Sequence, residues 1–162
     1  MAHKTEKIEL AWQDIYDIMS KMSSYEGRNA VTPSGDSDYP SVHITEQDGY
    51  AVTLSILHGA QAVMSEVGNL AYSVESDFGA SSDDVLTIET VYDDSRRTSS
   101  LLKKMFAEAI ASYGMMEWVM ERKSTRLEFY TNLYTQMVNN IKKTMSKKTR
   151  PSLDIYESDE ES

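Results

Sequence analysis

Residues 45–75 read TEQDGYAVTLSILHGAQAVMSEVGNLAYSVE, and this stretch sets the expected fold class. Apolar side chains recur at nearly every third or fourth position, which is the spacing that brings them to one side of an α-helix. Thr45 is a typical helix N-cap, and Asp48 three residues later can complete a capping box. Gly59 and its small neighbours would allow a second helix to approach closely. We therefore expect a long helix over about residues 46–75, central in the core.

Three further stretches carry the same helical spacing. One covers about residues 5–23, a second ends near Glu121, and a third starts at Ser124 or Thr125 and runs to a basic segment before Pro151. Cations in a last helical turn interact favourably with the helix dipole, and proline is a normal stop. The apolar stripe of the first helix is expected to be Ile8, Ala11, Trp12, Ile15, Met19 and Met22.

Residues 85–92, VLTIETVY, differ from the rest because β-branched and aromatic side chains dominate them. This composition predicts a β-strand within a non-helical segment at 84–94. A single strand needs a partner, which is either another segment of this chain or a neighbouring chain. Residues 24–44 are rich in turn-forming residues and predict an irregular loop.

These elements predict a mainly α protein. The expected architecture is a four-helix bundle-like domain over residues 1–150, with one β-strand or hairpin and an extended acidic C-terminal tail over residues 151–162. Its length of 162 residues fits one domain.

The charges are distributed unevenly along the chain. The formal net charge is -10, yet residues 96–150 carry a clear basic excess, whereas residues 21–95 and 151–162 are strongly acidic. Such polarity indicates an interaction surface, unless acidic and basic parts pair within one fold. The overall negative charge therefore does not exclude contact with DNA.

The composition excludes several classes of protein. The chain has no cysteine, so it has no disulfide scaffold, no Cys-ligated metal and no thiol nucleophile. No apolar run approaches the ~20 residues that span a bilayer, and residues 1–7 lack the apolar core of a signal peptide. We expect a protein made in the cytoplasm that does not enter a membrane.

No residue set typical of catalysis is present in the sequence. The nucleotide-binding glycine motifs, the nucleophile elbow and the metal-binding histidine motifs are all missing. His43 and Glu46 have metal-ligand spacing, but a metal site needs three or four converging ligands. We expect neither enzyme activity nor a metal or cofactor.

The end of the last helix and the tail are the candidate binding segments. Four lysines gather near the helix end, and they could contact DNA without sequence preference or an acidic protein surface: Lys142, Lys143, Lys147 and Lys148. The acidic tail is a solvated end, a segment that docks on another protein, or a phosphorylation site at Ser158 or Ser162.

The order of these segments resembles that of the head–tail connector, or adaptor, proteins of tailed bacteriophages. The likeness covers about residues 44–151. It rests on the following motifs, taken in order in a cysteine-free chain: ITEQD at 44–48 before an apolar helix, the β segment at 85–92, YGMMEW at 113–118 and KKTRP at 147–151.

The resemblance implies a structural virion protein made in the host cytoplasm. Such proteins form a ring, usually twelve-fold, beneath the portal protein, where they join head to tail, extend the DNA channel used in ejection and present a platform to the next tail component. It further implies that the tail contacts the portal, through Arg150, Pro151, Leu153, Ile155 and Tyr156. The strand would pair between subunits or form a projecting hairpin, through Val85, Leu86, Ile88 and Tyr92.

A second hypothesis follows from the acidic middle of the chain alone. Residues 21–95 contain thirteen acidic and two basic side chains. This excess is also compatible with a small cytosolic helical-bundle regulator, or a DNA mimic, that binds a basic host protein.

Overall fold

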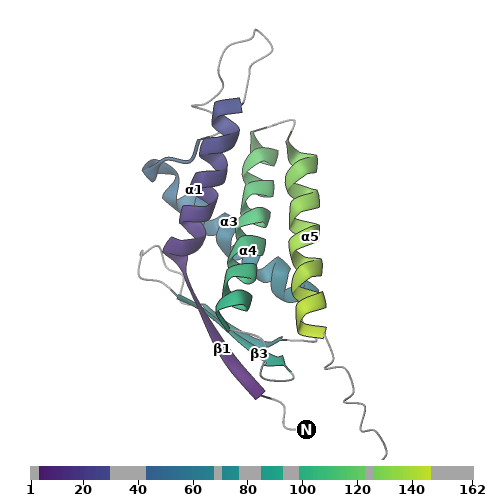
Figure 1. Cartoon of the computed structure of the whole chain (residues 1–162). Helices are drawn as coiled ribbons and strands as arrows, with labels where there is room; N and C mark the ends of the chain where they lie inside the picture. The colour runs from purple at the N-terminus through teal and green to yellow at the C-terminus, as the bar shows by residue number, and fades with distance from the viewer. Residues whose placement is uncertain are drawn as a thin grey trace, which may run out of the picture.

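The computed structural model describes residues 4–29, 43–67, 71–76, 85–92, 99–122 and 126–146. Within these ranges the protein is mainly helical, with a helical bundle standing on a small β-sheet (Figure 1). The predicted fold class, a mainly α, four-helix bundle-like domain with one β-strand or hairpin, is confirmed. The acidic tail lies outside the described residues.

The four helices are α1 (Trp12–Asn29), α3 (Gly49–Val67), α4 (Ser99–Glu121) and α5 (Leu127–Ser146). A single 3₁₀ turn, η1 (Glu46–Asp48), leads into α3. The strands are β1 (Lys4–Ala11), β2 (Ala71–Ser76) and β3 (Val85–Tyr92). The predicted strand at 85–92 and the predicted helix ending at Glu121 are therefore confirmed.

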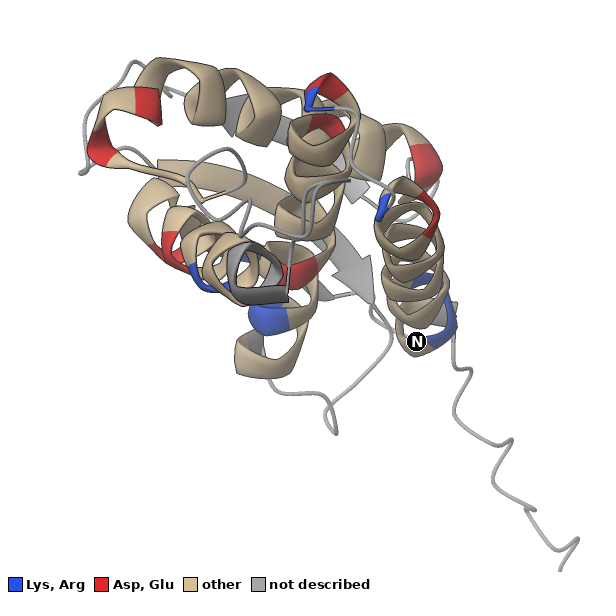
Figure 2. Ribbon diagram, turned by 90° about the horizontal axis from the view of Figure 1, so that it is seen from above, with Lys and Arg blue, Asp and Glu red and all other residues tan. Residues whose placement is uncertain are grey.

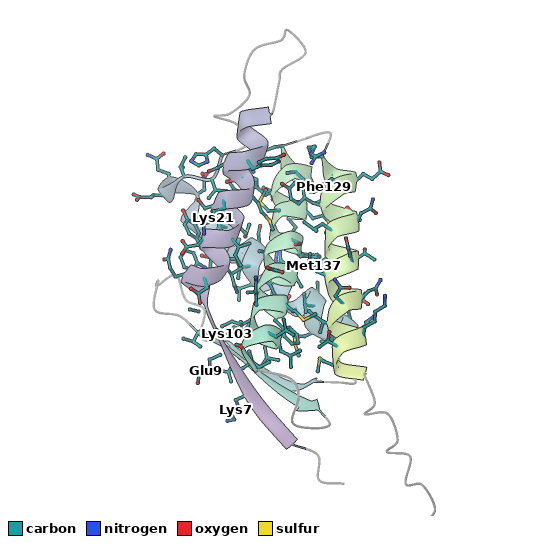
Figure 3. All side chains as sticks on the ribbon, in the orientation of Figure 1. Lys7, Glu9, Lys21, Lys103, Phe129 and Met137 are labelled. Carbon is teal, nitrogen blue, oxygen red and sulfur yellow. The ribbon has the colours of Figure 1, made fainter. Side chains whose placement is uncertain are left out.

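The three strands form one antiparallel sheet in the order β1-β3-β2. β3 lies in the middle, with Ile8 of β1 opposite Ile88 on one side and Val74 of β2 opposite Ile88 on the other. Ile8, Leu10, Leu86 and Ile88 are all buried. Lys7 and Glu9 alternate with Ile8 and Leu10 on the outer face of β1 (Figure 3), so β1 is apolar toward the bundle and polar toward solvent.

Helix α4 is the centre of the bundle. It packs against α1, α3, α5 and β1, and its buried side chains include Phe106, Ile110 and Trp118. Met137 of α5 points toward α4 and packs against the core (Figure 3). Because α4 has neighbours on several sides, its buried residues are spread around much of the helix, while Lys103 and Lys104 remain on its exposed side.

The first prediction that the structure corrects is the helix over residues 5–23. Residues 4–11 form strand β1, and the helix starts only at Trp12 and continues to Asn29. Ile8 fits either period, but Leu10 would lie on the opposite side of a helix from Ile8, whereas both face inward in a strand. α1 also continues to Asn29, into the segment 24–44 that was predicted to be a loop. The Ile44 N–H at the end of that segment donates a hydrogen bond to Ser23 Oγ of α1 at 3.1 Å.

The second correction concerns the C-terminal part of the long helix over residues 46–75. α3 ends at Val67, and residues 71–76 form β2 instead. Gly68 and Asn69 follow the last helical residue, and such residues commonly terminate a helix. The start was predicted correctly: the Asp48 carboxylate accepts hydrogen bonds from the Thr45 N–H and from the Thr45 hydroxyl, each at 2.8 Å.

Candidate interaction surfaces

The predicted basic site is divided by the structure. Lys142 Nζ donates to the Glu66 carboxylate at 3.0 Å and so connects α5 to α3. Lys143 is exposed on α5, while Lys147 and Lys148 lie outside the described residues. Acidic and basic residues are interleaved along the described helices (Figure 2). Lys142 therefore forms an ion pair within the chain. This agrees with the alternative that acidic and basic parts of the sequence pair within one fold.

A row of polar contacts continues from this ion pair along α3, α4 and α5. His58 Nδ1 of α3 lies 3.0 Å from the Glu117 carboxylate of α4, with the histidine side chain half exposed. The rings of Tyr113 and Tyr134 meet edge to face, with their centroids 5.1 Å apart. These contacts fix how α3 crosses the α4–α5 pair, and none of them converges on a substrate-sized site.

The two tyrosines of this row are held in their neutral form. Burial raises the pKa of Tyr134 to about 12, and the nearby Glu66 carboxylate and Tyr113 add to the effect. Burial, followed by the charge of Glu117, also raises the pKa of Tyr113. An ionised phenol between α4 and α5 would face reduced hydration and a carboxylate.

This gives a prediction for alkaline pH. Because the folded chain holds the Tyr134 proton more tightly than the unfolded chain, its contribution to stability is complete below pH 10 and is lost as the pH rises through about 12. We expect Tyr134→Phe to flatten the fall in melting temperature over this interval. The matched control is Tyr25→Phe, which removes a phenol from a side chain that is 64% exposed. Equal slopes for wild type and Tyr134→Phe would contradict the prediction.

The expected inter-subunit strand is corrected by the sheet topology. Val85, Leu86, Ile88 and Tyr92 belong to β3, whose two edges are paired with β1 and β2 of the same chain. Leu86 and Ile88 are fully buried, and Val85 is partly exposed. An inter-subunit strand would need a free edge, which in the described sheet belongs to β1 and β2 rather than to β3.

The predicted portal-binding tail cannot be compared with the structure. Arg150, Pro151, Leu153, Ile155 and Tyr156 lie outside the described residues, as do Ser158 and Ser162. Their roles remain predictions from the sequence.

The adjoining ends of α4 and α5 form a surface that the sequence did not predict. The Arg122 guanidinium lies 3.1 Å from the centroid of the Trp118 ring, and that of Arg126 lies 4.2 Å from the centroid of Phe129. Met120 and Phe129 are about half exposed there. Arginine, aromatic residues and methionine are enriched in protein interfaces. The spacings 118/122 and 126/129 on consecutive helices were the available signal.

The outward side of α3 is a second such surface. Its exposed residues include Tyr50, Leu54, His58, Gln61 and Ser65, whereas Val52, Ile56 and Val63 on the other side are buried. Tyr50 and Leu54 are among the large apolar side chains that the protein exposes.

The histidines do not form a metal site in the described part of the chain. His43 Nδ1 lies 3.1 Å from the Ser24 hydroxyl, and His58 has Glu117 as its partner. Among residues that the structure describes, no group of three or more potential metal ligands is found. None of the described helices has the length and apolarity to span a bilayer.

Comparison of the sequence with protein-family models and with curated proteins finds no match, and neither does comparison with solved structures.

Proposed function

We propose that this chain is a structural subunit of a tailed-phage virion that forms a ring at the portal vertex. In this role it joins head to tail, extends the DNA channel and presents a platform to the next tail component. The proposal rests on the order of sequence segments described above together with the mainly helical, bundle-like fold.

The observation that carries the proposal is the separation of two different surfaces on one bundle. The adjoining ends of α4 and α5, near Arg126 and Phe129, lie at one end of the bundle, and the sheet lies at the other (Figure 1). Each outer strand, β1 and β2, pairs only with β3 among the described residues. Rings are built by head-to-tail contacts, in which one surface of a subunit binds a different surface of its neighbour.

The tail provides the test of this function. We expect deletion of residues 152–162 to weaken attachment of the purified protein to the portal protein of the same virus, while the circular dichroism spectrum and melting temperature stay unchanged. The matched control is Lys103→Gln, which removes one positive charge from an exposed side chain of α4 and leaves the tail in place. Portal binding that is equal for the deletion and the full chain would contradict the assigned role of the tail.

A second candidate function, a small acidic regulator, is favoured by the carboxylates of Glu46 and Asp48 just before α3. Burial raises the pKa of Tyr16, and the charges of Glu46 and Asp48 reinforce the shift, so these carboxylates create a local negative field. A small acidic regulator of this kind would bind one basic host protein in a fixed ratio. Affinity capture from infected cells separates the two functions, because the connector should recover capsid and tail components only.

A further inference from the structure

The outward side of α3 carries no charge along most of the helix. Residues 49–65 contain no Asp, Glu, Lys or Arg, although these four types make up 26% of the chain. Two large apolar side chains on this side are accessible to solvent, because Tyr50 is 76% exposed and Leu54 is 38% exposed. In water a surface helix gains solubility from charged side chains, and an uncharged exposed side that includes large apolar side chains such as Tyr50 and Leu54 indicates a contact surface.

The two ends of this uncharged side carry opposite charges that have no ion-pair partner among the described residues, Glu46 at one end and Lys143 at the other. Just before α3, the Asp48 carboxylate accepts a hydrogen bond from the Thr45 N–H, and Glu46 is exposed. At the other end, Glu66 and Lys142 neutralise each other, and Lys143 is exposed beside them on α5.

We propose that the protein pairs with a second copy of itself through the outward side of α3. The two α3 helices run antiparallel about a two-fold axis. A contact of this kind requires a surface that is complementary to itself. The uncharged middle of α3 meets this requirement, and the antiparallel arrangement brings Glu46 of each copy toward the Lys143 end of the other.

The register of the contact follows from the midpoint of the exposed side. Residues 50 and 65 bound this side, and Leu54 and Gln61 lie at equal distances from its middle. In an antiparallel pair, Leu54 of one copy therefore faces Gln61 of the other, and His58 lies beside the axis. Leu54 and Tyr50 are the apolar side chains that the contact removes from water.

This pairing is independent of the proposed ring. A two-fold contact closes at two copies, whereas a ring requires contacts between two different surfaces. The pairing concerns the protein free in solution, whereas the ring concerns the protein bound to the portal. Either proposal can therefore fail its test while the other passes.

Sedimentation velocity of the full chain measures the pairing. We expect wild type to be a dimer, and Leu54→Glu to raise the dimer dissociation constant at least about 100-fold, because two carboxylates would enter an apolar contact. The matched control is Leu101→Glu on α4, where the leucine is 49% exposed, and this variant should remain dimeric. A monomeric wild type, or an assembly larger than two copies, would overturn the proposal.

Disulfide trapping tests the register, even if Leu54→Glu folds poorly. The chain has no cysteine, so a mixture of the single variants Leu54→Cys and Gln61→Cys reports only on the two introduced thiols. We expect the mixture to form a mixed disulfide faster than either variant forms one with itself. Faster self-linking of either variant would exclude the antiparallel register.

A charge exchange tests the ends. Glu46→Lys and Lys143→Glu should each weaken the dimer about tenfold at low salt, and the double variant should recover the wild-type dissociation constant. Failure of the double variant to recover it would show that these two ends do not meet.

Discussion

Replacement of Trp118 by alanine should lower the free energy of unfolding by about 3–5 kcal/mol. Trp118 is only 1% exposed and belongs to α4, the helix that contacts all the other helices and β1. Its removal leaves a cavity at the centre of the bundle and takes away the ring against which the Arg122 guanidinium lies. Urea denaturation followed by far-ultraviolet circular dichroism measures the loss without depending on tryptophan fluorescence.

The matched variant is Trp12→Ala. Trp12 lies at the start of α1, is only partly buried and stacks on Tyr16 with the ring centroids 4.8 Å apart. Its indole Nε1 is buried without a hydrogen-bond partner among the described residues, and an unpaired buried donor reduces what the side chain contributes. We therefore expect a smaller loss than for Trp118→Ala. An equal or larger loss for Trp12→Ala would contradict the central place given to α4.

Replacement of Gly59 by alanine should destabilise the protein by about 1–3 kcal/mol. A Cβ atom at this position would lie 2.8 Å from the carbonyl oxygen of Ile110 in α4. Because that oxygen belongs to the backbone, the helices must move apart to make room. The loss should appear even though alanine favours a helix interior over glycine by about 1 kcal/mol.

Gly114→Ala provides the matched control for Gly59→Ala. A Cβ atom there would meet the Met19 side chain, with its Sδ at 2.7 Å, and a methionine side chain can adjust its rotamer. Chemical denaturation of both variants should therefore show a clear loss for Gly59→Ala and a much smaller one for Gly114→Ala. Equal stability of Gly59→Ala and wild type would mean that α3 and α4 are not in such close contact.

The sequence predicts the fold class well where the apolar period is unambiguous. Residues 99–121 form one helix because no alternative period fits their apolar side chains, and residues 85–92 form a strand because β-branched residues dominate them. The small residue Gly59 was expected to permit a close helix crossing, and its contact with Ile110 has that geometry.

The sequence predicts less well where one residue fits two periods. Ile8 has the helical spacing of Trp12 and Ile15, so the sequence predicts a helix where the structure has strand β1. Ala71 and Val74 extend the spacing of α3 in the same way, although they belong to β2. In both segments, pairing with β3 outweighs the local preference. Strand pairing is a contact between distant residues, which a local period does not contain.

The candidate surfaces show a similar division. The lysines at the end of α5 were visible as a cluster of charge, but the pairing of Lys142 with Glu66 depends on how α3 crosses α5. The arginines stacked at the adjoining ends of α4 and α5 and the uncharged outward side of α3 became recognisable only when exposed and buried residues could be separated.

Electron microscopy of the protein co-expressed with the portal protein of the same virus tests the proposed function most directly. We expect a closed ring of this chain, stacked coaxially on the portal and continuing its channel, with a subunit number that matches the portal or divides evenly into it. A portal that purifies without this protein, or with single copies bound off its axis, would contradict the role as a connector.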